Sequence, residues 1–271
     1  MTTLKSTATF KLPSWLQTRS LSALLPTNCI LCNAWQSQAV CLTCQSRWRD
    51  HAPRCLRCAI RLPRQAQDQV CQACEDQSPE FDRAIAALDY EAPWKSAVSR
   101  LKFREAIAIA QPLAGLMHEA ICTRPHPVDM ILPVPLSSNR LRERGFNQAW
   151  LLAQHLSISL QRPARHDVLQ RTRHTHRLMS LDAEDRRAHI RDAFEVSEHK
   201  RSDIRHRHIA IVDDVLTTGA TLNEVALTLF EAGARSVSAW VLARTPAPDR
   251  PKGAPLQTSS GPELVHSLSR R

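Results

Sequence analysis

Residues 211–221 read IVDDVLTTGAT and are the most informative segment of this chain for its fold. An apolar strand from Ile209 to Val212 delivers two carboxylates, Asp213 and Asp214, at its carboxyl end. Open parallel sheets bind their ligands at that edge. A turn rich in hydroxyl groups comes next, and apolar residues at helical spacing follow from Leu222 to Ala232. This order predicts a ligand site at the rim of an α/β sheet.

The turn between the strand and the helix has the composition of an anion site. Its residues are Thr217, Thr218, Gly219, Ala220 and Thr221. Three hydroxyl groups and the backbone N–H groups can surround a phosphate, the glycine lets the backbone come close to it, and the helix N-terminus adds its dipole. We therefore predict that this turn binds a phosphate dianion.

The acidic pair indicates what the phosphate is attached to. The carboxylates of Asp213 and Asp214 can accept hydrogen bonds from ribose hydroxyls, and Mg²⁺ on a diphosphate offsets their repulsion of an anionic ligand. The alternative is that the aspartates merely end a strand and the threonines merely cap a helix. The whole eleven-residue order is far rarer than either piece, which favours a phosphorylated ribose as the ligand.

Strands alternate with helices on both sides of this stretch. Apolar runs predict strands at 84–90, 129–134 and 237–242, and helical spacing predicts helices at 94–103, 106–120 and 146–160. Such alternation implies a parallel sheet with right-handed crossovers. Residues 170–190 mix arginine and histidine with acidic residues and predict a mobile, solvated loop.

Three arginines, Arg140, Arg142 and Arg144, follow the predicted strand at 129–134 and should lie at the same edge of the sheet. Guanidinium groups suit diphosphate oxygens, so we predict a loop that binds diphosphate here. Lys102, at the end of a predicted helix, is a second candidate for the same diphosphate. A basic surface turn and an exposed helix-end lysine are the alternatives.

Paired cysteines dominate the N-terminal part of the chain. Eight of the nine cysteines form four C-x-x-C pairs, which are Cys29 and Cys32, Cys41 and Cys44, Cys55 and Cys58, and Cys71 and Cys74. In a reducing compartment such pairs hold metal more often than they form disulfides. We predict two Zn²⁺ ions, each bound by two pairs that are neighbours in sequence, and an interleaved pairing stays open. Sites made only of sulfur leave no position for water, so the zinc should be structural.

Other residues of the cysteine-rich segment suggest a second kind of contact. Its arginines are Arg47, Arg49, Arg54, Arg57, Arg61 and Arg64. They predict salt-sensitive contact with nucleic-acid phosphates, unless they are simply solvated. The ninth cysteine, Cys122, follows apolar residues and is predicted to be a buried structural thiol.

Composition narrows the class of protein. The 271 residues are 43% hydrophobic, which suffices for one full core and a small second module. The formal net charge of +10 favours phosphate or nucleic-acid ligands, or serves only solubility. No apolar run reaches the roughly 18 residues of a membrane span and no secretory signal is evident, so we expect a cytoplasmic protein.

The acidic pair and its turn resemble the phosphoribosyl-diphosphate signature of type I phosphoribosyltransferases. Together with the cysteine-rich start, the chain resembles the competence protein F (ComF) family from about Cys29 to Arg244. Further motifs of that family are Leu101-Lys102-Phe103, PVPL at 133–136, RLRERGFNQA at 140–149 and the element beginning Arg171-Thr172-Arg173. Two positions depart from the family pattern, because Leu178 replaces an expected glutamine and His189 an expected asparagine.

The resemblance implies a type I phosphoribosyltransferase fold and a part in handling incoming DNA during natural transformation, or a related housekeeping role. Its implied ligands are phosphoribosyl diphosphate with Mg²⁺, or a nucleotide, and its candidate partners are single-stranded DNA and other DNA-uptake proteins. Three functions stay open. They are a ComF-like binding protein, an active phosphoribosyltransferase of undetermined acceptor, and a single-stranded DNA adaptor whose sugar site has become a phosphate clamp.

The expected organisation has four parts. These are an N-terminal extension at 1–28, a double zinc ribbon at 29–78, a phosphoribosyltransferase-like domain at 79–245 and a disordered tail at 246–271. The tail is rich in proline, serine and basic residues, a composition that cannot bury a core. The expected fold class is therefore α/β, a parallel sheet flanked by helices with a small zinc-ribbon module before it.

Overall fold

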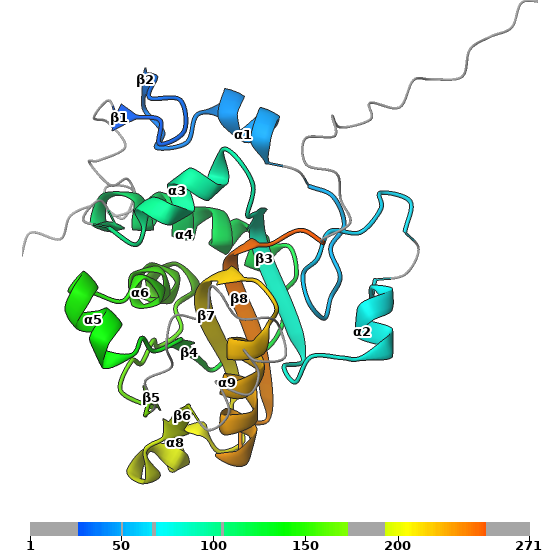
Figure 1. Cartoon of the computed structure of the whole chain (residues 1–271), viewed down its shortest axis with the longest axis vertical. Coiled ribbons are helices and arrows are strands. Elements are labelled where there is room, and N and C mark those ends of the chain that lie inside the picture. The colour runs from blue at the N-terminus through cyan, green and yellow to red at the C-terminus, as the bar shows by residue number, and fades with distance from the viewer. Residues whose placement is uncertain (1–26, 50, 67–68, 104–105, 173–192, 248–271) are drawn as a thin grey trace, which may run out of the picture.

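The computed structural model describes residues 27–49, 51–66, 69–103, 106–172 and 193–247. Its centre is a four-stranded parallel sheet with the strand order β3-β8-β7-β4 (Figure 1). The strands are β3 (Arg83–Asp89), β4 (Met130–Pro133), β7 (His208–Leu216) and β8 (Ser236–Arg244). The predicted parallel sheet is confirmed.

Some predictions fall wholly or mostly outside the described residues. They concern the extension at 1–28, the loop at 170–190 and the tail at 246–271. The two departures from the family pattern, Leu178 and His189, lie outside as well. Among the residues that are described, no helix combines the length and the apolar character needed to cross a membrane.

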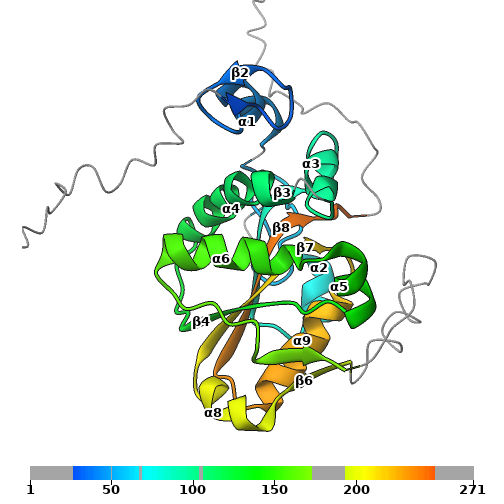
Figure 2. The same cartoon turned by 90° about the vertical axis from the view of Figure 1, so that its left-hand side faces the viewer.

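Helices cover both faces of the sheet (Figure 2). They are α3 (Trp94–Arg100), α4 (Ala106–Cys122) and α6 (Gln148–Leu160) on one side and α9 (Ala220–Glu231) on the other. Alternate residues of β7 point to opposite faces of the sheet. Ala210 and Val212 lie in a buried cluster with α4 and α6. Ile209 and Ile211 lie in another cluster with α9. Burial on both faces explains why these strands are nearly continuous apolar runs in the sequence.

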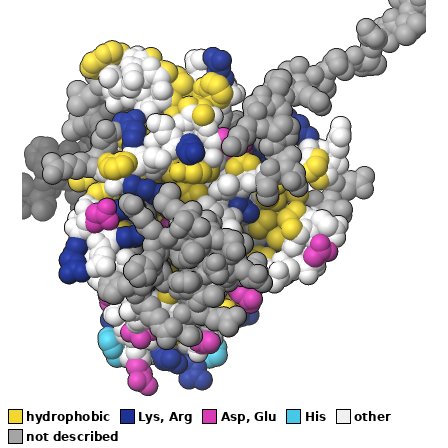
Figure 3. All heavy atoms as spheres, in the orientation of Figure 1, with side chains coloured by type: hydrophobic (Ala, Val, Ile, Leu, Met, Phe, Trp, Pro, Cys, Tyr) yellow, Lys and Arg dark blue, Asp and Glu magenta, His cyan; other side chains and the backbone are white. Residues whose placement is uncertain are grey.

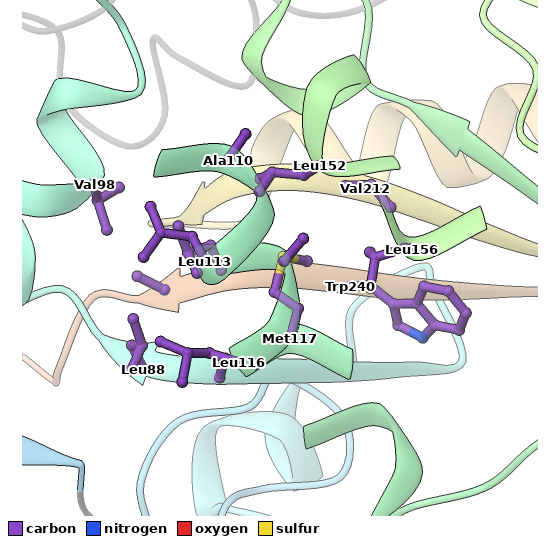
Figure 4. Close-up of a cluster of buried hydrophobic side chains, with 14 of the residues drawn as sticks. Leu88, Val98, Ala110, Leu113, Leu116, Met117, Leu152, Leu156, Val212 and Trp240 are labelled. Atoms are coloured by element: carbon purple, nitrogen blue, oxygen red, sulfur yellow. The ribbon is translucent and has the colours of Figure 1, made fainter. Parts of the chain in front are cut away.

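The larger cluster lies between the sheet and the helices α4 and α6 (Figure 4). Its members include Leu113 and Met117 of α4, Leu152 and Leu156 of α6, and Trp240 of β8, none more than 2% exposed. Each such side chain contributes roughly 1.5–3 kcal/mol on burial. The polar edge of the indole is satisfied too, because its Nε1 donates to His126 Nε2 at 3.3 Å. This packing fixes the strands whose carboxyl ends carry the predicted site.

Several short elements differ from the prediction. The predicted loop that carries the three arginines is wrong, because they lie in helix α5 (Ser138–Arg144). Ser137 caps this helix and Gly145, with φ of 78°, ends it. The antiparallel strands β5 (Leu169–Arg171) and β6 (Phe194–Val196), the 3-10 turn η4 (Glu198–Lys200) and the helix α8 (Arg201–Ile204) were not predicted.

The first cysteine-rich unit, which we call the first ribbon, packs on the helices α3 and α4. It contains β1 (Thr27–Asn28), β2 (Trp35–Gln36) and α1 (Leu42–Trp48). Cys29, Val40 and Cys44 belong to the same buried cluster as α4. The indole Nε1 of Trp94 donates to the carbonyl of Trp48 at 2.6 Å. This unit therefore shares the core of the sheet domain.

The second cysteine-rich unit, which we call the second ribbon, lies against the edge strand β3. It contains α2 (Gln72–Asp76) and a small apolar cluster of Cys55, Leu62 and Cys74. The backbone N–H of Ala84 on β3 donates to the carbonyl of Leu56 at 3.0 Å. The two cysteine-rich units thus contact different parts of the same α/β domain.

Candidate functional site

The eight paired cysteines form two groups of four. One consists of Cys29, Cys32, Cys41 and Cys44 and the other of Cys55, Cys58, Cys71 and Cys74, and within each group the sulfur atoms lie within 4.8 Å of one another. The predicted pairing in sequence order is therefore the one in the structure. Four sulfur ligands around one point fit a tetrahedral structural Zn²⁺.

Hydrogen bonds to sulfur favour the thiolate form of one cysteine in each group. The backbone N–H of Cys41 donates to Cys29 Sγ at 3.5 Å, and that of Cys71 donates to Cys55 Sγ at 3.3 Å. Burial acts to raise the pKa of Cys29, but backbone N–H groups outweigh it and lower this pKa to about 6. The Cys58 side chain and backbone N–H groups lower the pKa of Cys55 to about 4.

The other thiols show why a cation is needed. Burial and neighbouring cysteines raise the pKa of Cys44, and burial with neighbouring charges raises that of Cys74 to about 12. Four adjacent thiolates repel one another, so the metal-free groups cannot ionise fully. Bound Zn²⁺ would remove that repulsion, so the donor set fits this metal.

The prediction for the ninth cysteine was wrong. Cys122 is exposed, and its Sγ lies 3.5 Å from Nε2 of His118. It follows Ile121, which is buried, but each step along a helix turns the side chain by about 100°. The apolar neighbours in sequence therefore lie on a different face of α4.

The acidic pair lies near the carboxyl end of the strand β7. β7 runs on to Leu216, so Asp213 and Asp214 come before its end rather than after it. Asp214 is 6% exposed, and Lys102 Nζ lies 3.2 Å from its Oδ2. Burial, followed by the charge of Asp214, raises the pKa of Asp213 well above its usual range, while Lys102 acts in the opposite direction. The structure thus brings Lys102 to the acidic pair.

The turn after the strand leaves a helix N-terminus open. Thr217 and Thr218 are exposed, and Gly219 adopts φ of 86°, a left-handed conformation that favours glycine. Gly219 is the N-cap of α9 and has no side chain to satisfy the first N–H groups of the helix. The hydroxyl of Thr218 accepts only a long 3.5 Å bond from the N–H of Ala220. The first backbone N–H groups of this helix could therefore donate to an anion.

Helix α5 separates the three arginines by direction. Residues four apart share a helix face and residues two apart do not, so Arg142 points away from the face of Arg140 and Arg144. Arg142 is exposed and its Nη2 donates to Asn139, whereas Arg144 Nη1 donates to Gln148 at 3.0 Å.

Arg171 is a site residue to which sequence reasoning gave no role. Burial, and then the charge of Arg140, lowers the pKa of Arg171, while the charge of Asp213 raises it. These three groups therefore lie within electrostatic reach of one another. The guanidinium of Arg171 lies 5.2 Å from the ring centroid of Phe194 on β6. The family motif at 171–173 was the available signal, but the short strand that holds the residue was not predicted.

Two protein families match different parts of this chain. Residues 145–259 match the phosphoribosyl transferase domain family, and residues 20–75 match the double zinc ribbon domain family. The first match includes the turn and α9, and the second includes all eight paired cysteines. With the parallel sheet and the two cysteine groups, these matches confirm the predicted fold class.

Individual proteins match over most of the chain. Competence protein F of Haemophilus influenzae is 35% identical over 210 residues, which cover 76% of this chain and 90% of that protein. DNA utilization protein YhgH of Escherichia coli O157:H7 is 33% identical over 229 residues, 82% of this chain and 98% of the relative. Competence protein ComFC of Bacillus subtilis is 28% identical over 246 residues, 80% of this chain and 95% of the relative.

Proposed function

This chain belongs to the competence protein F family, and from that premise we propose that it binds phosphoribosyl diphosphate with Mg²⁺, or a nucleotide, and acts in DNA uptake. The observation that carries the proposal is the geometry at the end of β7, where an acidic pair precedes an uncapped helix N-terminus. Anions bind at such helix starts, and carboxylates bind sugar hydroxyls and Mg²⁺.

Each group at the rim then has a role. The turn at 217–221 holds the 5′-phosphate through backbone N–H groups and hydroxyls. Asp213 and Asp214 accept hydrogen bonds from the ribose hydroxyls, and Mg²⁺ neutralises the diphosphate beside them. Arg140 supplies positive charge to the diphosphate. Lys102 forms an ion pair with Asp214 in the free protein. When the ligand is present, it contributes positive charge to the binding of the diphosphate.

Binding does not require catalysis, and an active phosphoribosyltransferase is the alternative within this proposal. In that reaction the bond between the anomeric carbon and diphosphate breaks, diphosphate leaves with the bonding electrons, and an acceptor of undetermined identity forms the new bond. Positioning and charge stabilisation would supply the rate without a covalent nucleophile. Release of diphosphate from phosphoribosyl diphosphate, followed with and without candidate acceptors, distinguishes an enzyme from a binding protein.

Calorimetric titration with phosphoribosyl diphosphate and Mg²⁺ tests the binding. We expect the wild-type protein to bind this ligand. Asp213→Ala and Asp214→Ala should each weaken binding by roughly tenfold or more, because each removes a hydrogen bond between the ligand and a charged group. Asp76→Ala, at an exposed aspartate on α2, is the matched control and should bind as the wild type does. Absence of binding in the wild type, or equal binding in all variants, would refute the proposal.

A single-stranded DNA adaptor is the second candidate, and one surface favours it. On the first ribbon Trp35 is 74% exposed and Trp48 42% exposed, with the guanidinium of Arg47 4.8 Å from a ring centroid of Trp48. Figure 3 shows apolar side chains at the surface of this ribbon, at the top of the view, with Lys or Arg side chains near them. Exposed aromatic rings beside cations suit stacked bases and phosphates.

DNA titrations at several salt concentrations separate the two candidates. If DNA is a ligand of the ribbon, Trp35→Ala and Trp48→Ala weaken binding and Asp214→Ala does not. Ile158→Ala, at a residue 77% exposed on α6, controls for loss of surface apolar area. DNA binding that depends on the aspartates and not on the tryptophans would contradict the adaptor.

The cellular setting is part of the same proposal. We propose that this chain acts in the cytoplasm, with incoming single-stranded DNA and other DNA-uptake proteins as partners. The names of its relatives, which mention competence or DNA utilization, support the part of this proposal that concerns DNA. A reducing compartment keeps the eight thiols available for Zn²⁺. Transformation frequency in cells that express Asp214→Ala or Trp48→Ala in place of the wild type would report which site the process requires.

A further inference from the structure

Arg244 ends the strand β8 at the carboxyl edge of the sheet. Its partners in register are Asp89 on β3 and Leu216 on β7. The Nε of Arg244 donates to the carbonyl of Cys58 at 2.9 Å, and its Nη1 donates to the carbonyls of Leu216 at 3.0 Å and Thr217 at 2.6 Å. One guanidinium group thus joins the second cysteine group to the start of the turn at 217–221.

The Cys58 carbonyl belongs to a ligand residue of that cysteine group. Cys55 and Cys58 contribute two of its four sulfurs. The chain turns sharply just after Cys58, because Ala59 has a left-handed φ of 56° and its N–H donates to the carbonyl of Cys55 at 2.9 Å. A metal bound through Cys55 and Cys58 therefore fixes the direction of the carbonyl that Arg244 uses.

Other contacts hold the second ribbon firmly against this edge. Arg54 and Arg61 both form ion pairs with Asp89, the residue beside Arg244 in the sheet. Arg54 and Asp89 are each only 8% exposed, so salt screens their attraction less than it would at the surface. The ribbon is therefore a fixed support from which Arg244 reaches the turn.

The direction of these hydrogen bonds matters for an anion site. In a trans peptide the C=O and the following N–H point in opposite directions. When Arg244 holds the carbonyls of Leu216 and Thr217 on one side, the N–H groups of Thr217 and Thr218 are aimed at the other side. Thr217 and Thr218 are exposed, so packing alone does not restrain them.

We propose that Arg244 is a positioning residue that ties the turn at 217–221 to the second zinc site, which is the group of Cys55, Cys58, Cys71 and Cys74. The second ribbon with its metal bound then sets the affinity of the turn for a sugar phosphate. The sugar phosphate as ligand rests on the proposed function, but the anchoring of the turn does not. Zinc at this site then has an effect on ligand binding at a distance, through one side chain and two main-chain carbonyls.

Two measurements on Arg244→Gln test the anchor separately from the ligand. Without ligand, hydrogen exchange of the segment 213–222 should be faster than in the wild type. In calorimetry, affinity for phosphoribosyl diphosphate with Mg²⁺ should fall about tenfold, the change expected when a charged hydrogen bond is lost. Metal analysis should still return two zinc ions per chain, which excludes metal loss as the cause.

Two further variants exclude a merely structural effect. Arg244→Lys keeps the positive charge, but its donors all lie on one nitrogen, which can hold the turn or the ribbon but not both. Its affinity should therefore lie between those of Arg244→Gln and the wild type. Arg57→Gln removes a different ribbon contact, the 3.1 Å bond from its Nη1 to the carbonyl of Asp82 before the amino end of β3, and should leave the affinity unchanged.

A cycle with the second zinc site tests the coupling itself. Cys58→Ser, which disrupts that site, should weaken ligand binding in the wild-type background and have little further effect in Arg244→Gln, because the link is already absent. Additive losses, or unchanged exchange and affinity in Arg244→Gln, would overturn the proposal. If Arg244→Gln does not fold, Arg244→Lys decides, and wild-type exchange and affinity in that variant would also overturn it. If the wild type binds no phosphoribosyl diphosphate but the turn exchanges faster in Arg244→Gln, the ligand is wrong and the anchor stands.

Discussion

Asp213 has an environment that opposes its own charge. Burial and the neighbouring carboxylate of Asp214 raise its pKa well above the usual range. A carboxyl group of this kind lowers stability at neutral pH, because the unfolded chain lets it ionise freely in water. A bound cation or ligand hydroxyl groups would offset this cost, which is consistent with the role we propose for Asp213.

The sign of this effect gives a prediction for Asp213→Asn. Since the pKa in the folded state is raised, the folded protein binds more protons than the unfolded chain, and stability falls as pH rises from the ordinary aspartate pKa through the raised one. An asparagine at this position does not titrate, so Asp213→Asn should raise Tm at neutral pH by about 2–4 °C, the shift that ~1 kcal/mol produces in a domain of this size. The same change should weaken binding of the sugar phosphate.

Thermal unfolding followed from acid to neutral pH checks this expectation. The difference in Tm between Asp213→Asn and the wild type should grow as pH rises and shrink in acid. Asp76→Asn, at an exposed position on α2, is the control for loss of a surface carboxylate. A variant less stable than the wild type at neutral pH would mean that the carboxylate of Asp213 is stabilised by its surroundings, contrary to the burial argument.

Helix α5 makes its three arginines inequivalent, because they point to different faces of the helix. The charge of Arg140 lowers the pKa of Arg171, and the charge of Asp213 raises it, so Arg140 lies on the side of the acidic pair. Arg144 lies on the same face of α5 as Arg140. We expect Arg140→Gln to weaken binding of phosphoribosyl diphosphate about tenfold, as loss of a charged contact does, and Arg144→Gln to weaken it less. Arg142→Gln, on the opposite face, is the matched control.

Calorimetry in parallel with a salt series separates a direct contact from a general field effect. A direct contact predicts that Arg142→Gln binds as the wild type does. Equal losses from all three variants would instead indicate that α5 contributes only diffuse positive charge, since diffuse charge does not depend on which face carries it.

The same elements show what could be predicted from the sequence. The strand β7 and the helix α9 were predicted because burial on both faces and a regular apolar face leave clear patterns. Helix α5 was taken for a loop, although Ser137 and Gly145 are the residues expected at its two ends. The pair β5 and β6 has three residues in each strand and forms through tertiary contacts that no local pattern records. Arg171 was therefore left without a role, because its position depends on that pair.

The two ribbons and the α/β domain are joined by hydrogen bonds, so the ribbons are not a module attached to an independent domain. The expected division at residues 78 and 79 is a proposal drawn from composition. Contacts cross it in both ribbons, since Arg100 on α3 donates to the carbonyl of Ile30 at 3.1 Å and Arg244 donates to that of Cys58. Sequence spacing predicted the two cysteine groups but not these contacts, because an arginine that binds a carbonyl leaves no pattern in one sequence.

Shared contacts predict that zinc stabilises the whole molecule and not the ribbons alone. Metal bound to the folded state only raises its stability with the logarithm of free metal concentration. Cys29, Val40 and Cys44 pack in the same cluster as α4, so loss of metal from the first group should loosen the main core as well. We expect chelation to lower Tm of the sheet domain by several degrees, since about 2–4 °C corresponds to each kcal/mol at this size.

Calorimetric melting at controlled free zinc, with metal analysis of each sample, provides the measurement. The metal-loaded protein should contain two zinc ions and unfold in one transition, and titration with chelator should move that transition as a whole. Cys122→Ser removes the exposed cysteine outside the two groups and should change neither the metal content nor Tm. A separate early transition of the ribbons, with the sheet domain melting at an unchanged temperature, would show that the contacts across Ile30 and Cys58 carry little energy. In that case zinc binding at the second site could not change the affinity of the turn at 217–221 through Arg244 either. The contact between Arg244 and Cys58 would have to carry both the stabilisation of the sheet domain and the effect on ligand binding.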